Sequence, residues 1–289
     1  MFGFATLSSG LAVRTDRGLA PLDALIGQPV QARDVRALLP GWDSWTDAVT
    51  AALPGYEGPW RTEREVIFLP PVTHRPTVYC AGANYRDHLA EMERGQSQAE
   101  PYHFLIPPAA LAGHRGTATR PPGMHRLDWE AELAVVIGRR ADAVTPEQAL
   151  GYVAGYTIAN DLSCRDERAM STGIFGIHWL LQKGWRGLKP LGPAVVPARF
   201  VTDPGALRIR LSVNDQIRQD SDTGQMIFSV PQQIAALSAI VALEPGDLVL
   251  TGTPAGTAAA HGRRYLTPGD RVVAEIEGLG QLSTVISGA

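Results

Sequence analysis

Cysteines and long apolar runs are scarce in this chain. Among 289 residues only Cys80 and Cys164 are cysteine, which is too few for a disulfide framework or a thiolate metal site. No apolar run is long enough to cross a bilayer, and the start, MFGFATLSSGLAVRTDRG, lacks the basic-then-apolar order of a signal peptide. We therefore expect a cytoplasmic protein that does not enter a membrane.

An excess of charge of one sign is also missing. The chain has 26 basic and 29 acidic residues, a formal net charge of -3. This balance is too even to indicate nucleic acid or an anionic membrane as a partner. Hydrophobic residues make up 45% and charged residues 19%, which is ordinary for a globular protein with a sizeable core.

The first 70 residues differ from the rest. They contain short apolar pieces, a polar-faced helical segment at 44–53, and then LPPVTHRP at 69–76. Paired prolines interrupt regular structure and hold the chain extended, so this segment is predicted to be a linker. We predict a small N-terminal α/β domain over 1–70 and a larger domain over 71–289.

The larger domain is predicted to be rich in short strands. TVYCAG and WEAELAVVIG are typical of strands, a third strand ends at Asn160–Asp161, and LRIRLSVNDQIRQ predicts a hairpin turning at Asn214–Asp215. A short helix capped by Thr145 and an amphipathic helix in VPQQIAALSAIVAL are also expected. Alternating βαβ units are missing, which favours a β-rich α+β fold.

A helix is predicted in NYRDHLAEMERG. We expect Asn84 to cap it, with Asp87 at the third position as in a capping box, and Gly95 to end it. His88 and Glu91 lie three apart and share one helical face. A carboxylate beside an imidazole orients the ring and raises its basicity, as required to activate water. An ordinary surface pair is the alternative for so short a pattern.

Two acids share one face of a strand that is otherwise apolar. Glu130 and Glu132 in WEAELAVVIG are two apart, and Ala134 and Val136 continue their face. Burying two anions side by side is unfavourable unless a cation compensates, and hard divalent cations prefer carboxylate oxygens. Asp161, at the end of the next strand, supplies a third acid. The alternative is a strand end whose acids reach solvent or pair with arginines.

Basic and hydroxyl residues follow the acids along the chain. Lys183, Arg165 and Arg168 are candidates to neutralise the acids or to bind a substrate carboxylate, although loop cations are commonly solvated. TGTPAG places Thr251 and Thr253 in a glycine-rich turn where hydroxyls and backbone N–H groups can bind an anion. This turn is not a phosphate loop, because no G-K-[S/T] follows, and it can equally be a plain turn.

Taken together, these segments resemble the fumarylacetoacetate hydrolase superfamily from about Val78 to the C-terminus. The blocks that carry the resemblance are, in order, GANYRDHLAEM, DWEAELAVVIG, YVAGYTIANDLSCRD, a lysine before PLGP, RQDSDTGQMIFS and LEPGDLVLTGTPAG. Six blocks in the family's order are far more specific than any one of them. Bacterial acylpyruvate and 2,4-diketo acid hydrolases are the members it resembles.

The resemblance implies a mixed β-sheet roll preceded by a variable N-terminal domain, and a homodimer that uses Mg²⁺ or Mn²⁺, or Ca²⁺. It implies metal ligands at Glu130, Glu132 and Asp161, catalytic residues at His88, Glu91 and Lys183, and substrate contacts at Thr253 and Tyr85, with Arg165 and Arg168 nearby. His88 and Glu91 would lie on a lid helix.

The chain also departs from the family pattern. FLIPP has Ile106 where many relatives have a lysine, CRDER has Arg168 where a glutamine is common, and Gly184, Trp185 and Arg186 replace the usual S-F-D. These changes affect positions where the polar ends of a substrate would be recognised, so the substrate cannot be assigned by analogy.

Three functions fit this sequence. The first is metal-dependent hydrolysis of a C–C bond in a small 1,3-diketo acid such as an acylpyruvate or a sugar-derived diketo acid. The second is decarboxylation, tautomerisation or isomerisation, or dehydration of an oxo-acid at the same site, because all pass through a metal-stabilised enolate. The third is an inactive metal-binding relative, which the departures at Ile106 and Arg168 would support.

Overall fold

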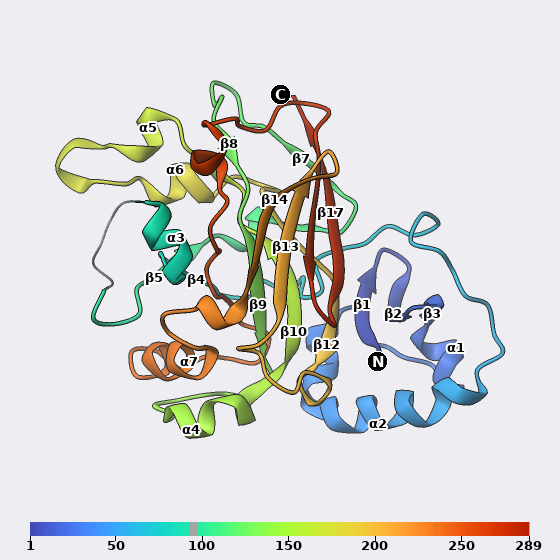
Figure 1. The fold of residues 1–289 in the computed structure, drawn as a ribbon. Helices are drawn as coiled ribbons and strands as arrows, with labels where there is room; N and C mark the ends of the chain where they lie inside the picture. The colour runs from blue at the N-terminus through green and yellow to red at the C-terminus, as the bar shows by residue number, and fades with distance from the viewer. Residues whose placement is uncertain (93–97, 289) are drawn as a thin grey trace.

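The computed structural model of the chain describes residues 1–92 and 98–288 (Figure 1). Within these residues the strands form one large and two smaller sheets. The large sheet contains, in spatial order, β3 (Gly18–Pro21), β2 (Gly10–Thr15), β1 (Gly3–Leu7), β12 (Lys189–Pro197), β10 (Val153–Asn160), β9 (Ala131–Ile137), β15 (Leu248–Leu250), β4 (Val78–Ala81) and β5 (His103–Ile106), with β6 (Leu111–Gly113) paired to β12.

The smaller sheets are mostly antiparallel, like the large one. The five-stranded sheet has the order β14 (Gln216–Asp222), β13 (Arg208–Val213), β16 (Arg271–Ile276), β17 (Gly280–Ser287) and β7 (Thr117–Thr119). The two-stranded sheet pairs β11 (Ser163–Cys164) with β8 (Leu127–Asp128). Parallel pairs join β12 to β6, β15 to β4 and β17 to β7, so the sheets are mixed as expected.

The helices are short and lie around the sheets. They are α1 (Leu22–Ile26), α2 (Trp42–Ala52), α3 (Arg86–Glu91), α4 (Pro146–Ala149), α5 (Glu167–Met170), α6 (Trp179–Lys183) and α7 (Val230–Ser238). Single 3₁₀ turns lie at Val35–Gly41, Leu53–Gly55, Pro108–Ala110, Leu150–Tyr152, Gly173–Phe175, Ala198–Phe200, Thr223–Gln225 and Ala258–His261. In the part of the chain that is described, no helix is long and apolar enough to span a membrane.

Strand β9 divides the interior into two cores. Every residue of AELAVVI is buried, because both faces of the strand are covered. Leu133 and Val135 pack into a core shared with the five-stranded sheet, whereas Ala134 and Val136 pack into a second core shared with the N-terminal residues. Since alternate residues of a strand point to opposite faces, the continuous apolar run LAVVI at 133–137 predicts burial on both sides.

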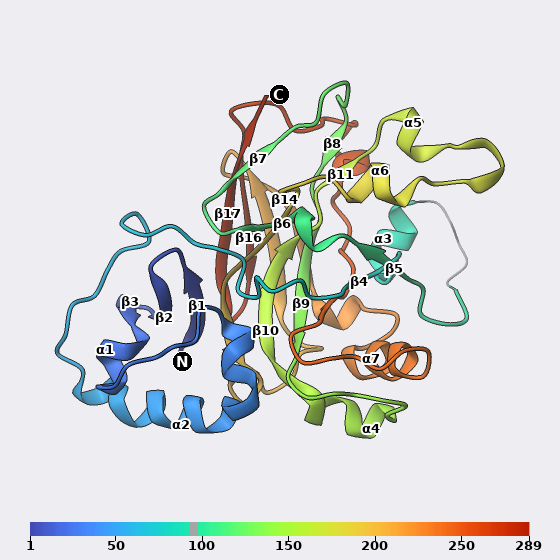
Figure 2. The same ribbon diagram turned by 180° about the vertical axis from the view of Figure 1, so that it is seen from behind.

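The N-terminal strands continue the large sheet. β1 pairs antiparallel with β12, with Phe4 opposite Val195, and the indole of Trp42 donates a hydrogen bond of 2.6 Å to the carbonyl of Ala154. Figure 1 shows β1–β3, α1 and α2 on one side of the molecule and α3, α5 and α6 on the other, and Figure 2 shows the same separation from behind. The domain boundary near residue 70 stays a prediction.

Two local predictions are confirmed. Asn214 and Asp215 join β13 to β14 with φ of 49° and 63°, the left-handed conformation that a two-residue hairpin of this type needs. Thr145 and Gln148 form a capping box at the start of α4.

The predicted cap of the His88 helix is wrong. α3 begins at Arg86, and the buried Asn84 side chain is bonded elsewhere: its Oδ1 accepts from the Phe228 N–H (2.9 Å), and its amide nitrogen donates to the carbonyls of Thr251 (2.9 Å) and Phe228 (3.0 Å). These long-range hydrogen bonds occupy the side chain that a cap would need. Asp87 instead accepts a hydrogen bond of 2.6 Å from the hydroxyl of Ser221. The predicted stop at Gly95 lies outside the described residues.

Candidate metal centre and active site

The three acids selected from the sequence come together. Glu130 immediately precedes β9, Glu132 lies within it, and Asp161 follows β10, which is hydrogen-bonded to β9. The backbone N–H of Asp161 donates to the carbonyl of Glu130 over 2.8 Å, which fixes the two strand ends side by side. One carboxylate oxygen from each acid lies within 4.8 Å of the others, and all three side chains are buried.

Three cations surround these acids. The Lys183 ammonium donates to Glu130 Oε2 over 2.5 Å and also to Asp161 Oδ2. Arg165 donates to Glu130 Oε1 and, over 3.1 Å, to Asp128 Oδ2. The third cation is Lys189, whose Nζ lies 2.8 Å from Asp161 Oδ1.

No role was assigned to Lys189 or Asp128 from the sequence, although signals for both exist. Asp128 precedes Glu130 by two residues and so extends the alternating acidic face. Lys189 opens KPLGPAVVP, a wholly buried strand, and a lysine in such an apolar segment requires a charged partner.

Burial raises the pKa values of buried acids, and nearby positive charges lower them. Burial, followed by the nearby Asp161 carboxylate, raises the pKa of Glu132 well above its usual value. Burial also opposes ionisation of Asp161, but Lys183 and Lys189 together hold the pKa of this carboxyl below its usual value. The same acids raise the pKa of Lys183 although burial lowers it. A cluster with an ionised Asp161 and a partly uncompensated Glu132 is suited to bind a further positive charge.

The donors of this cluster fit a hard divalent cation. Carboxylate oxygens are the ligands that Mg²⁺, Mn²⁺ and Ca²⁺ select, and no sulfur or imidazole is among the three clustered groups. Among the described residues Glu132 accepts one hydrogen bond, over 2.7 Å from the Gly252 N–H; Asp161 and Glu130 repel its carboxylate, and Lys183 offsets part of this repulsion.

The predicted His–Glu pair is formed. His88 is buried and its Nδ1 lies 3.1 Å from Glu91 Oε2. Glu91 Oε1 in turn accepts a hydrogen bond of 3.0 Å from the Gly256 N–H. Although burial opposes ionisation, these hydrogen bonds hold the pKa of Glu91 below its usual value. An ionised Glu91 orients the ring through Nδ1 and leaves Nε2 as the nitrogen that can exchange a proton with another group.

One loop connects the dyad with the acids. The TGTPAG segment donates from Gly252 to Glu132 and from Gly256 to Glu91. Gly252 has φ of 94°, and an added Cβ would come within 3.0 Å of Asn84 Cβ. Both facts explain why glycine is needed at this turn.

Thr253 and Gln219 hold that loop against β9. Thr253 is buried, its hydroxyl donates to the carbonyl of Ala131 and accepts from the Gln219 amide, both over 2.9 Å. Gln219 also accepts from the Ala131 N–H over 2.9 Å. Gln219 was not selected from the sequence, because its partners are distant along the chain and β14 gives no local sign of them.

The remaining predicted substrate residues differ in their positions. Tyr85 is buried, and burial together with the nearby Glu132 raises the pKa of its phenol. Arg165 contacts the acids, whereas Arg168 is exposed on α5. The departure at Ile106 is buried in an apolar core, so no cation is placed there.

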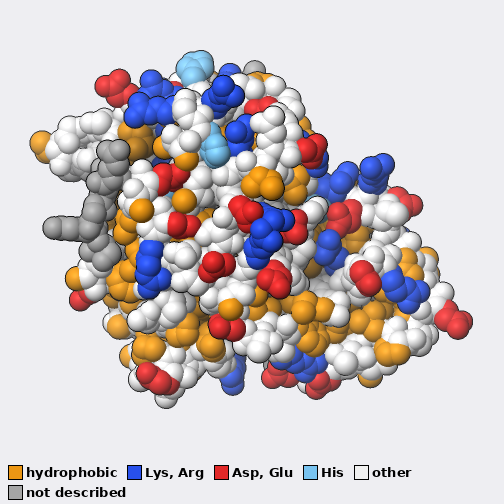
Figure 3. Space-filling model, in the orientation of Figure 1, with side chains coloured by type: hydrophobic (Ala, Val, Ile, Leu, Met, Phe, Trp, Pro, Cys, Tyr) orange, Lys and Arg blue, Asp and Glu red, His pale blue; other side chains and the backbone are white. Residues whose placement is uncertain are grey.

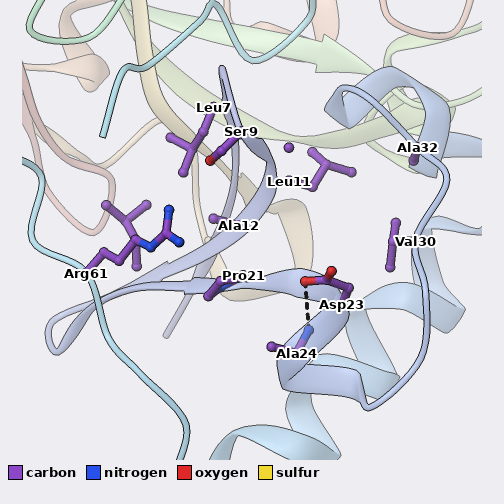
Figure 4. A pocket seen from close by; sticks show the side chains of 12 residues that line it. Leu7, Ser9, Leu11, Ala12, Pro21, Asp23, Ala24, Val30, Ala32 and Arg61 are labelled. Carbon is purple, nitrogen blue, oxygen red and sulfur yellow. Dashed lines mark hydrogen bonds between the residues drawn. The ribbon is translucent and has the colours of Figure 1, made fainter. Parts of the chain in front are cut away.

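Charged side chains of both signs share one face of the molecule, and a pocket lies outside the candidate site. Figure 3 shows acidic and basic side chains interspersed over one face of the molecule. A pocket of about 400 Å³ lies among the N-terminal strands and α1, lined by Leu11, Asp23, Val30 and Arg61 among others (Figure 4). None of its lining residues belongs to the acid cluster or the His88–Glu91 dyad.

Fold and site together define a strand-rich α+β protein built around a buried carboxylate centre. Residues 77–287 match the family model described as fumarylacetoacetate (FAA) hydrolase C-terminal. The chain belongs to the fumarylacetoacetate hydrolase family, and its predicted fold class is confirmed.

The names of similar proteins describe several different reactions. A mitochondrial oxaloacetate tautomerase of Bos taurus is 42% identical over 217 residues, covering 75% of this chain and 68% of the relative. A 4-hydroxyphenylacetate degradation bifunctional isomerase/decarboxylase of Escherichia coli is 36% identical over 283 residues, 96% of this chain but only 60% of the relative. The structure of maleylpyruvate hydrolase from Sphingobium sp. SYK-6, in complex with manganese (II) ion and pyruvate, has a TM-score of 0.79 and 28% identity and covers both chains fully.

Proposed function

We propose that this protein is a divalent-metal-dependent hydrolase that cleaves a C–C bond in a small 1,3-diketo acid. The observation that carries the proposal is the shared loop: Gly252 is bonded to the acid cluster and Gly256 to the His88–Glu91 dyad. A proton-transfer dyad and a cation-binding cluster fastened by one short segment act on one substrate. Acylpyruvates and sugar-derived diketo acids are the candidate substrates.

Glu130, Glu132 and Asp161 would hold Mg²⁺ or Mn²⁺, or Ca²⁺. When bound, such an ion supplies Lewis-acid stabilisation of the negative charge that develops on the 2-oxo-acid end of the substrate. The pattern of buried oxygen donors supports this assignment. The maleylpyruvate hydrolase structure with manganese and pyruvate supports it as well.

The proposed reaction begins with His88. Held by Glu91, its Nε2 takes a proton from water, and the hydroxide adds to the distal carbonyl carbon of the substrate. The C–C bond then breaks, its electron pair stays with the pyruvate-like fragment as an enolate, and the imidazolium returns the proton to that carbon. Lys183 and Arg165 lie among the acids and would stabilise the oxyanion charge. Tyr85 and Thr253 are buried and would contact the substrate.

Enol–keto chemistry is the second candidate, and a specific observation favours it. The relative that is 42% identical is an oxaloacetate tautomerase, and another relative is an isomerase/decarboxylase. Tautomerisation, isomerisation, decarboxylation and dehydration need the same enolate stabilisation but no attack by water. Arg165 and Lys183 would then stabilise the negative charge of the same enolate.

The test is a product assay on chelator-stripped protein with and without added Mg²⁺ or Mn²⁺. Pyruvate would be measured from a panel of acylpyruvates and sugar-derived diketo acids, and conversion of enol to keto oxaloacetate would be followed in parallel. Metal-dependent pyruvate release supports hydrolysis. Metal-dependent oxaloacetate conversion without pyruvate release transfers the proposal to the second candidate. No turnover in either assay, despite metal binding, contradicts hydrolysis and tautomerisation and leaves decarboxylation, isomerisation, dehydration of another oxo-acid or a metal-binding role.

We also propose a homodimer in the cytoplasm, although one relative is mitochondrial. Size-exclusion chromatography with light scattering would give twice the chain mass of 31.0 kDa for the dimer. A mass of one chain would contradict it.

A further inference from the structure

Lysine is almost absent from this chain. Of the 26 basic residues only Lys183 and Lys189 are lysine, and the other 24 are arginine. Both lysines are buried, with exposed fractions of 5% and 1%, and both contact Asp161. Arginine therefore serves at every other cationic position of the chain, while both ε-ammonium groups lie at one carboxylate.

Lys189 occupies the less exposed of the two positions. It is the first residue of β12, and its Nζ lies 2.8 Å from Asp161 Oδ1 and donates to the carbonyl of Leu162. Lys183 donates a hydrogen bond to the other oxygen of the same carboxylate, Asp161 Oδ2. A buried ammonium loses its hydration, so it is stable only against a charged partner. Lys189 is therefore part of the charge balance of the centre.

The charge of the centre shows what this second ammonium does. Its charged side chains are Asp128, Glu130, Glu132, Asp161, Arg165, Lys183 and Lys189. With all of them ionised the net charge is -1, and without Lys189 it would be -2. A more negative centre is less stable when empty and attracts a divalent cation more strongly.

We propose that Lys189 is a built-in counter-cation of the metal centre. It positions Asp161, offsets carboxylate repulsion before a metal binds, and lowers the affinity of the acids for divalent cations so that the ion can exchange. The inference rests on the proposed metal role of Glu130, Glu132 and Asp161. An ammonium is a compact point charge, and Lys189 places it 2.8 Å from one oxygen of Asp161, whereas a guanidinium is a planar fork suited to bidentate contacts.

Replacing Lys189 with methionine removes the charge and keeps the apolar stem. We expect the Kd for Mn²⁺, measured by calorimetric titration of chelator-stripped protein, to fall about tenfold or more, because one like charge near the ion is lost. The unfolding temperature of the metal-free variant should fall, and the rise on adding Mn²⁺ should be larger than in the wild type. A lysine with a merely structural role would lower stability without tightening metal binding.

The matched control is Arg210→Met, which removes one positive charge from a partly exposed position of β13, paired with Asp220, and should leave the Kd unchanged. If the wild type binds Mn²⁺ and the folded Lys189→Met variant binds it equally or more weakly, the counter-cation role of Lys189 is overturned and the metal centre is not. Absence of Mn²⁺ binding by the wild type would overturn the metal centre itself. If the methionine variant does not fold, Lys189→Gln, which keeps a donor for the Leu162 carbonyl, is expected to tighten binding in the same direction.

The wild type gives an independent test, because ε-¹³C-lysine labelling yields signals from only two side chains. Paramagnetic Mn²⁺ at one equivalent should broaden both signals, and excess Mg²⁺ should restore them. Broadening of only one signal, assigned to Lys183 with the Lys189 variants, would place Lys189 away from the ion and contradict the proposal.

Discussion

His88 is buried, and its Nδ1 lies 3.1 Å from Glu91, so the ring is fixed in one tautomer. Replacing His88 with alanine removes the proposed base, and turnover should fall about 10²–10⁴-fold. The Kd for Mn²⁺ should not change, because among the described residues the His88 ring is bonded to Glu91 and no hydrogen bond or ion pair joins it to the three acids. Initial rates of pyruvate release at saturating metal measure the effect.

His125→Ala is the control for this variant, because His125 is an exposed histidine that precedes β8. It should retain its turnover. A His88→Ala protein that turns over at the normal rate would remove the dyad from the mechanism.

Gln219 makes a prediction about stability. It is fully buried and bonds the Ala131 N–H, the Thr253 hydroxyl and the Pro254 carbonyl. The Thr253 hydroxyl would keep its bond to the Ala131 carbonyl, but Gln219→Leu would remove the partner of the Ala131 N–H and of the Pro254 carbonyl, at a cost of about 1–3 kcal/mol for each unsatisfied buried group. Urea denaturation should show this loss, whereas Gln216→Leu, at an exposed position of the same strand, should change the free energy of unfolding by less than about 0.5 kcal/mol.

The residues that the sequence revealed and those it hid differ for a physical reason. Glu130, Glu132 and Asp161 could be selected because polar residues interrupt apolar strands, and the pairing of β9 with β10 brings them together. Lys189 and Gln219 act across the sheet on residues far away in the sequence, so no local pattern names their partners.

Among the elements, α3 shows how tertiary contacts override a local pattern. Asparagine is a common helix-capping residue, but the amide of Asn84 is hydrogen-bonded to the carbonyls of Thr251 and Phe228. The helix therefore begins two residues later. Where the signal is contained in the turn itself, as at Asn214–Asp215, the prediction is confirmed. Elements defined by short-range geometry are thus predictable, while those held by distant partners are not.

The 61–69 segment is fastened by an ion pair that should depend on pH. Glu63 contacts His114 (3.0 Å) and Arg14 (2.8 Å). The hydrogen bond from His114 and the Arg14 guanidinium lower the pKa of Glu63 from 4.5 to about 2, although burial alone would raise it. Because the folded pKa is depressed, the stabilisation is full above the unfolded pKa and is lost as the pH falls from about 4.5 towards 2.

Urea denaturation of wild type and Glu63→Gln tests this element. The variant should be less stable at pH 7, and the difference should shrink progressively below pH 4.5. Glu57→Gln, at an exposed glutamate nearby, should match the wild type at every pH. A difference between Glu63→Gln and wild type that is constant from pH 7 to pH 3 would contradict the assigned ion pair.

For the whole molecule, the fold explains why the centre is buried yet charged. β9 separates two apolar cores, and the acids lie at its beginning and beside the end of β10, where the strands give way to loops. The sequence predicted the strand-rich fold and its blocks. It could not show that β1 pairs with β12, because nothing local links the first residues of the chain to residues near 195.

The central claim is that Glu130, Glu132 and Asp161 hold a divalent metal ion. The measurement that tests it most directly is calorimetric titration of Mn²⁺ into chelator-stripped wild type and Glu132→Gln. Glutamine keeps the size of the side chain and can still accept the Gly252 N–H, so only the charge at the centre is lost. We predict one site per chain in the wild type and binding weakened at least about tenfold in the variant. Equal affinity in the two proteins, or no site in the wild type, would contradict the account.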